Sequence, residues 1–162
     1  MSTAVAVPRT PSPEDAPRRR MDPMRKVALA GGIAYLASFA FSIPQLALFA
    51  DLIDDPSGFI SGSASNDAVL LGSWLEVLTA FSCIATAVAL YPATRLVSRT
   101  AAIGFVTSRV LEASLILVGV LGILTVLTLK ADFAGAAGAD SAMLQMIGET
   151  LVAMRQWTFL LG

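Results

Sequence analysis

Three charged residues lie inside otherwise apolar runs of the sequence and are the groups best placed to do chemistry. Arg109 and Glu112 lie within 101–129, and Glu76 lies within 69–91. A three-residue step puts Arg109 and Glu112 on one helix face, where they can pair. A lone charge at mid-bilayer costs at least about 2.5–3.5 kcal/mol, and pairing or facing other helices lowers that cost. We therefore expect a buried intramembrane cluster of these three residues that faces the bundle interior.

The three residues also lie at comparable depths in the membrane. At about 1.5 Å per residue, Arg109 and Glu112 lie roughly 12 and 16 Å above the cytoplasmic side, and Glu76 roughly 22 Å. These depths are uncertain by a helical turn or more, and within that range one arginine and two carboxylates can meet, which leaves one acid in excess. Such a cluster is either a proton or cation relay, or a docking site for a charged substrate. Alternatively, it is a structural clamp that fixes the register of the helices.

Other kinds of chemistry are excluded by the residue types that the sequence lacks. There is no histidine, which removes Ser-His and Cys-His dyads and the HExxH zinc motif. No glycine-rich phosphate-binding motif occurs, and the one cysteine, Cys83, permits no intrachain disulfide. We predict no catalytic residue, no metal and no cofactor. The formal net charge of −1 gives no case for nucleic-acid binding.

The composition indicates the elements that must position these charges. Hydrophobic residues make up 56% of the chain and charged residues 14%, against about a quarter charged in soluble domains. Runs of about 20 apolar residues suffice to cross a bilayer, and the sequence contains three, at 27–50, 69–91 and 101–129. Trp74 and Tyr91 fit the aromatic belts at the two ends of the second run. Pro92 is expected to end that helix.

The charges in the connecting segments alternate in sign. Residues 1–24 form a proline-rich tail that we expect to be disordered, with basic residues in it and just beyond. The segment 51–68 is predicted to be an acidic loop without Lys or Arg, and 92–100 a short loop with Arg95 and Arg99. This is the positive-inside pattern for a cytoplasmic N-terminus. The basic N-terminal flank either sets this topology or also binds anionic lipid.

The last segment, 141–162, is predicted to be a fourth helix. Leu144, Ile147 and Leu151 fall at helical spacing, and Trp157 is a third candidate interface anchor. The segment is either an interfacial helix or the beginning of a further span. Because the apolar run TFLLG is followed by nothing polar, we expect the membrane domain, 25–162, to be truncated at its C-terminus.

Small and polar residues recur along each predicted span at alternating steps of four and three. That spacing places each set on one helix face, and small residues let helices approach closely. We therefore predict an all-α integral membrane bundle with these faces turned inward. Besides Glu76 and Glu112, this helix-packing seam comprises Gly31, Tyr35, Ser38, Ser42, Gln45, Gly72, Thr79, Cys83, Ser108, Gly119 and Gly122.

Four stretches of the chain resemble a family of bacterial multi-pass membrane proteins, the domain-of-unknown-function 4386 family. They are RKVALAGGIAYLASFAFSIP, VLLGSWLEVLTAFSCIATAVALYP, AIGFVTSRVLEASLILVGVLGILTVLTL and QWTFLLG, which together cover most of 25–162. The RVLEA segment, with Arg109 and Glu112, is the most distinctive. The resemblance implies a membrane location and a helical bundle, with further membrane helices after QWTFLLG. It implies no catalytic or binding residue.

The sequence thus predicts a multi-pass protein of a bacterial cytoplasmic membrane, and we expect it not to be an enzyme. It acts either as a transporter-like module or as an accessory subunit that packs against a partner or a second copy in the bilayer. A membrane-embedded enzyme for a lipid or isoprenoid substrate is the alternative, and a lipid-charge sensor is a third. The missing histidines and the absence of an aspartate pair within a span stand against the enzyme.

Overall fold

The computed structural model describes residues 21–62, 65–133 and 139–161, and over these residues the fold is entirely helical. Helices α4 and α5 are the two longest. Six helices are present in the described part, with no strand: α1 (Pro23–Leu48), α2 (Ala50–Asp54), α3 (Pro56–Ser61), α4 (Asp67–Val97), α5 (Arg99–Phe133) and α6 (Ala139–Leu161). The predicted all-α fold is confirmed. The predicted disordered tail, 1–24, lies almost wholly outside the described residues.

Helices α1, α4 and α5 are long and apolar enough to cross a membrane. Large apolar side chains on α1 face outward: Leu36 is 70% exposed and Ile43 63% exposed. Side chains of this kind are solvated by lipid in a membrane protein. The prediction of three membrane-spanning helices is therefore confirmed.

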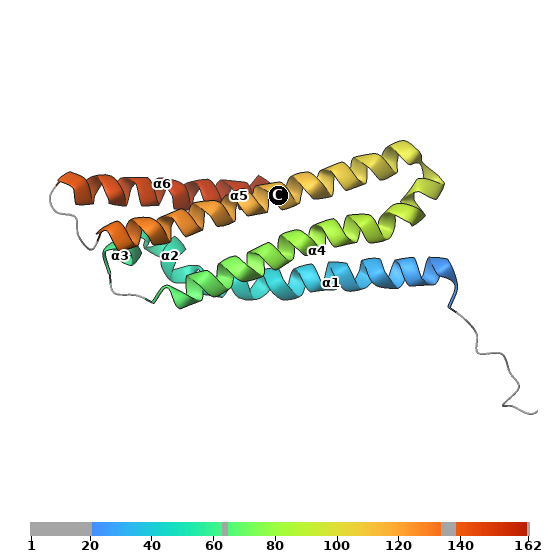
Figure 1. Cartoon of the computed structure of the whole chain (residues 1–162), viewed down its shortest axis with the longest axis horizontal. Helices are drawn as coiled ribbons and strands as arrows, with labels where there is room; N and C mark the ends of the chain where they lie inside the picture. The colour runs from blue at the N-terminus through green and yellow to red at the C-terminus, as the bar shows by residue number, and fades with distance from the viewer. Residues whose placement is uncertain (1–20, 63–64, 134–138, 162) are drawn as a thin grey trace, which may run out of the picture.

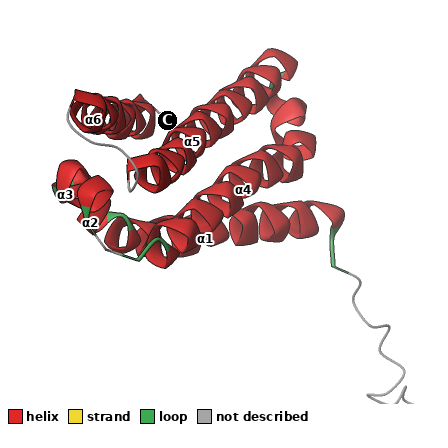
Figure 2. Cartoon of the chain, turned by 60° about the vertical axis from the view of Figure 1, so that its left-hand side comes forward, coloured by secondary structure: helices red, strands yellow, loops and turns green. Residues whose placement is uncertain are grey.

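The long helices pack in the order in which they occur in the chain. Helix α1 lies against α4, α4 against α5, and α5 against α6 (Figure 1). In the second view, α1, α4, α5 and α6 form a curved row, and α2 and α3 lie between α1 and α6 on its open side (Figure 2). Helix α6 runs lengthwise beside α5 (Figure 1). Helix α6 thus packs along one of the candidate spans, although it is not itself among the helices long and apolar enough to cross a membrane.

Two connections differ from the sequence-based expectation. Helix α4 does not end at Pro92 but continues to Val97, so the connection to α5 is reduced to Ser98. A proline removes only one backbone donor, and membrane helices tolerate that loss. The Ser98 hydroxyl then accepts from the Ala101 N–H at 3.3 Å, which satisfies a free donor at the start of α5.

The predicted loop 51–68 contains the short helices α2 and α3 instead. Asp55 caps α3, because its side chain accepts from the Gly58 N–H and from the Ser57 hydroxyl, both at 2.9 Å. The apolar residues of this segment are the reason that it folds back onto the bundle. The main core cluster comprises Phe49, Leu52, Phe59, Ile60, Val69, Ile123, Val126 and Val152.

Candidate functional site: a polar cavity among the membrane helices

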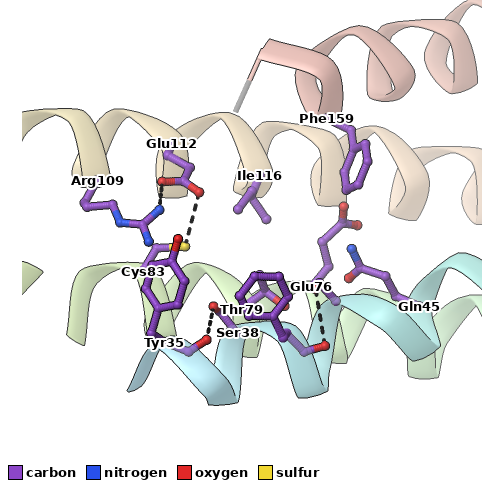
Figure 3. A pocket seen from close by; sticks show the side chains of 12 residues that line it. Tyr35, Ser38, Gln45, Glu76, Thr79, Cys83, Arg109, Glu112, Ile116 and Phe159 are labelled. Carbon is purple, nitrogen blue, oxygen red and sulfur yellow. Dashed lines mark hydrogen bonds and ion pairs between the residues drawn. The ribbon is translucent and has the colours of Figure 1, made fainter. Parts of the chain in front are cut away.

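A cavity of about 250 Å³ lies among α1, α4 and α5, beside the C-terminal turn of α6. Most of the residues around it are polar, although it lies between helices long and apolar enough to span a membrane (Figure 3). They are Tyr35, Ser38, Phe39, Ser42, Gln45, Glu76, Thr79, Cys83, Arg109, Glu112, Ile116 and Phe159. All three residues of the predicted charged cluster therefore border one cavity.

Arg109 and Glu112 form an ion pair within α5 at one end of the cavity (Figure 3). Their side chains are 15% and 23% exposed. The Arg109 guanidinium also lies over the Tyr35 ring of α1, 5.3 Å from its centroid, where the ring face attracts a cation. The other Glu112 oxygen, Oε1, accepts from the Cys83 thiol at 3.6 Å. This pair therefore links α5 to both α1 and α4.

Glu76 has a different partner at the other end of the cavity. Its Oε1 accepts a hydrogen bond from Arg155 Nη2 at 3.0 Å, and both side chains are only 3% exposed. The Arg155 guanidinium lies 4.8 Å from the centroid of the Phe49 ring and 5.0 Å from that of Phe159. The pair joins α4 to α6 through a buried, charge-assisted hydrogen bond.

The ion pairing therefore differs from the hypothesis made from the sequence. Glu76 pairs with Arg155 and not with Arg109, and the expected excess acid is balanced because two arginines accompany two glutamates. Arg155 was missed because its segment was considered only as an interfacial or incomplete helix. The available signal was its spacing: Ile147, Leu151 and Arg155 follow at steps of four, which places the arginine on the apolar face.

Several buried polar atoms at this site have no hydrogen-bond partner within the described residues. They are Gln45 Oε1, Glu76 Oε2, Arg109 Nε and Arg155 Nε. Gln45 is 1% exposed and Glu76 2% exposed. Buried polar atoms are nearly always hydrogen-bonded in folded proteins, and leaving one unpaired costs about 1–3 kcal/mol. Three of these four residues, Gln45, Glu76 and Arg109, line the cavity, and Arg155 lies beside it as the partner of Glu76.

The glycines of the predicted seam lie where helices approach closely. Gly31 faces the Leu90 side chain of α4, and Gly72 faces the Phe49 ring. Gly119 and Gly122 face α6, against side chains such as that of Thr158. In each of these places the absence of a Cβ lets another side chain fill the space.

The other members of the seam are divided between the cavity and the outer surface. Thr79 and Cys83 are buried, and Ser38, Ser42 and Gln45 border the cavity with them. Tyr35 borders the cavity too, although it is 47% exposed. Ser108 lies on the exposed side of α5.

The three predicted interface anchors lie on or near the outer surface. Trp74 is 67% exposed and Trp157 65% exposed. Tyr91 is half-buried, with the Arg95 guanidinium 5.9 Å from the centroid of its ring. Among the described residues, no group of three or more Cys, Asp or Glu side chains is arranged to hold a metal ion.

The helical fold, with three helices long and apolar enough to cross a membrane, defines a multi-pass membrane protein of the helical-bundle class. The sequence model of one family, a domain of unknown function (DUF4386), matches residues 30–162. This chain belongs to that family, as the RVLEA segment and its neighbours predict. No curated protein and no solved structure matches the chain.

Proposed function

We propose that this chain is a transporter-like membrane module, without enzymatic activity, that binds a small polar ligand in the cavity among α1, α4 and α5. One observation carries the proposal: Gln45, Glu76 and Arg109, each with a buried polar atom that has no partner among the described residues, line a cavity between helices long and apolar enough to cross a membrane. Polar groups are expensive inside a membrane and mark binding sites and ion pathways there. A structural clamp needs the two ion pairs but does not need a cavity between them.

An enzymatic role is less well supported by the side chains around this cavity. General acid–base catalysis uses a group that can exchange a proton with the substrate. Glu76 and Glu112 are each held by an arginine, and the sequence offers no histidine to replace them. The arrangement suits binding of a ligand better than proton transfer to it.

The distribution of charge supports an orientation with the N-terminus in the cytoplasm of a bacterial cell and the bundle in its inner membrane. Helix α1 begins at the same end of the bundle at which α4 turns into α5 (Figure 1). The first turn of α1 holds Arg25 and Lys26, and the turn from α4 to α5 holds Arg95 and Arg99. The opposite end, around α2 and α3, carries Asp51, Asp54 and Asp55 and one base, Lys130, whose ammonium lies 3.8 Å from the centroid of the Phe59 ring. Lys and Arg accumulate on the cytoplasmic side of membrane proteins, and the basic end also suits contact with anionic lipid head groups.

A role as an accessory subunit or in a homo-oligomer is compatible with the outer face of α1. Helix α1 packs on α4, yet apolar side chains such as Leu36 and Ile43 remain exposed along it. Such a face packs on lipid or on another membrane helix. Both roles are compatible with ligand binding in the cavity.

Native mass spectrometry of the full chain released from lipid nanodiscs tests the proposed function. We expect a small molecule to remain bound to the wild-type protein and to be lost from Thr79→Val, which removes a hydroxyl from the cavity wall. Thr86→Val is the matched control, because Thr86 is buried on the same helix and also bonds its own backbone, but does not border the cavity. Equal retention by the two variants, or no bound molecule in the wild type, would contradict the proposal.

A further inference from the structure

Two neighbouring cavities lie between α4 and α5 close to the turn that joins these helices. The cavity at the turn measures about 450 Å³ and is lined by Tyr91, Arg95, Leu96 and Arg99. The next cavity measures about 270 Å³ and is lined by Val88, Tyr91, Ile103, Val106 and Thr107. Because Tyr91 borders both cavities, they adjoin, and we call the pair the α4–α5 groove.

The spacing of the lining residues makes the groove continuous along both helices. Val88, Tyr91 and Arg95 follow one another on α4 at steps of three and four, and Arg99 and Ile103 are four apart on α5. Residues three and four apart are neighbours on one helix face. Each helix therefore presents an arginine to the groove at the turn and apolar side chains further into the membrane span.

The α4–α5 groove lies beyond the part of α5 that α6 covers. Gly119 of α5 faces Thr158, close to the C-terminal end of α6, and α6 ends well short of the turn between α4 and α5 (Figure 1). Val88 is 66% exposed and Ile103 is 52% exposed. Lipid tails are as apolar as such side chains. The apolar part of the groove is therefore open to an acyl chain.

The two arginines at the turn have a positive charge that no carboxylate balances. Within the described residues, neither Arg95 nor Arg99 forms an ion pair, and the sequence 77–111 contains no Asp or Glu. Asp22, at the start of α1, caps its own helix. The Arg95 guanidinium lies 5.9 Å from the centroid of the Tyr91 ring, which keeps it at the border between the two cavities. The charge at the groove thus suits an anion.

We propose that the α4–α5 groove binds an anionic phospholipid. The lipid phosphate accepts hydrogen bonds from the guanidinium groups of Arg95 and Arg99, whose planar N–H arrays match phosphate oxygens. One acyl chain lies along Val88 and Ile103. A zwitterionic head group binds less well, because the two arginines repel its ammonium group. The site is separate from the cavity among α1, α4 and α5 and does not depend on a ligand there.

Native mass spectrometry of the full chain in detergent micelles, titrated with one probe at a time, tests the proposal. Phosphatidylglycerol has the net charge and the acyl chains, phosphatidylcholine with the same chains lacks the net charge, and glycerol 3-phosphate lacks the chains. We expect a single phosphatidylglycerol molecule to bind saturably and phosphatidylcholine to bind about tenfold more weakly. Glycerol 3-phosphate should not bind at the concentrations that saturate the lipid site.

A pair of double variants tests the arginines. Arg95→Gln with Arg99→Gln should weaken phosphatidylglycerol binding about tenfold or more, because charge-assisted hydrogen bonds to the phosphate are lost. The matched control is Arg25→Gln with Lys26→Gln. It removes the same charge from the same end of the bundle, but these two residues do not line the groove, and binding should stay close to that of the wild type.

A second pair of variants tests the apolar part of the groove. Val88→Trp leaves both arginines in place and puts a large ring where the acyl chain lies, so it should weaken phosphatidylglycerol binding about tenfold. Phe81→Trp is its control, because Phe81 is 63% exposed on the same helix and lines neither cavity of the groove.

Four results would overturn the proposal. Equal weakening in the two double variants would mean that the lipid responds only to the total charge of this end. Equal binding of phosphatidylcholine would remove the role of the head-group charge. Equal binding of glycerol 3-phosphate would indicate a site for free phosphate, and undiminished lipid binding in Val88→Trp would leave the groove unused. If the arginine double variant does not fold, the wild-type selectivity and Val88→Trp decide.

Discussion

The two ion pairs beside the cavity differ in how they are built. Arg109 and Glu112 are three residues apart on α5, and both side chains keep some exposure. Glu76 and Arg155 are 79 residues apart, on α4 and α6, and are almost fully buried. The first pair forms wherever the local helix forms. The second exists only once the helices have assembled.

Because of this difference, breaking the two pairs should cost different amounts of stability. A local pair on a helix contributes a few tenths of a kcal/mol in water. Breaking a buried pair by removing one partner costs about 3–5 kcal/mol, because the remaining charge is left uncompensated. We therefore expect the Glu76–Arg155 pair to hold α6 in place and the Arg109–Glu112 pair to tune the far end of the cavity.

The largest effect is expected from Arg155→Leu. The substitution leaves Glu76 buried without its partner, and we predict a loss of about 3–5 kcal/mol in the free energy of unfolding. Denaturation with SDS in mixed micelles, followed by circular dichroism, measures this loss. The double variant Glu76→Leu with Arg155→Leu should be more stable than the sum of the two single losses predicts. If Arg155→Leu alone lowers the free energy of unfolding by no more than about 0.5 kcal/mol, as surface substitutions typically do, the buried pair does not hold the fold.

A smaller effect is expected at the local pair. Glu112→Gln removes the charge but keeps an acceptor for Arg109, which also keeps its contact with the Tyr35 ring. We predict a loss of about 1–2 kcal/mol in the same assay. Glu149→Gln, at an exposed position on α6, is the control and should change stability by less than about 0.5 kcal/mol. A loss at Glu112 as large as that at Arg155 would erase the distinction between the pairs.

A substitution at Gly72 should displace the Phe49 ring, which packs against Arg155 of the buried Glu76–Arg155 pair. A Cβ at this position lies 2.9 Å from Phe49 Cε1, and Phe49 is fully buried against Arg155. Gly72→Ala should cost about 1–3 kcal/mol, as overpacking does. Gly104→Ala, where a Cβ meets nothing within 4 Å, should instead stabilise the protein by about 0.5–1 kcal/mol, since it removes a helical glycine. Equal effects would mean that the Phe49 ring moves freely.

The smallest effect is expected outside the spans, at the cap of α3. The Gly58 N–H and the Ser57 hydroxyl donate to Asp55 and hold the pKa of that carboxyl below its ordinary value of 3.8. A lowered pKa in the folded state means that the carboxylate stabilises α3 above pH 3.8 and that this contribution is lost as the pH falls through the lowered pKa. The amide NMR shift of Gly58 should therefore titrate with a midpoint below 3.8. In Asp55→Asn that titration should vanish, and its persistence would assign it to another group.

Most of the fold could be predicted from the sequence because its signals are local. The length of the apolar runs predicted the membrane spans, and the three-residue step in the RVLEA segment predicted the Arg109–Glu112 pair. Pro92 and the segment 51–68 were interpreted wrongly for a physical reason. A proline costs a membrane helix one hydrogen bond and does not have to end it. The buried side chains of Leu52, Phe59 and Ile60 find partners only in the assembled bundle.

The cavity could be predicted only in part. The spacing of Ser38, Ser42 and Gln45 on α1, and of Glu76 and Thr79 on α4, indicated which faces turn inward. This spacing could not identify the partner of Glu76, because arginines on two different helices were available. Helical periodicity predicts the helix face on which a residue lies, but not which residue of another helix it contacts. The sequence also gave no measure of the space left between the helices.

The partner of Glu76 is the central claim and can be measured directly. Solid-state NMR of the full chain in lipid bilayers, with ¹³C-labelled glutamate and ¹⁵N-labelled arginine, reports the dipolar coupling between the Glu76 carboxylate and each arginine guanidinium. We predict a strong coupling to Arg155, in keeping with the 3.0 Å hydrogen bond, that disappears in Arg155→Lys. A strong coupling to Arg109 instead, unaffected by Arg155→Lys, would contradict the account.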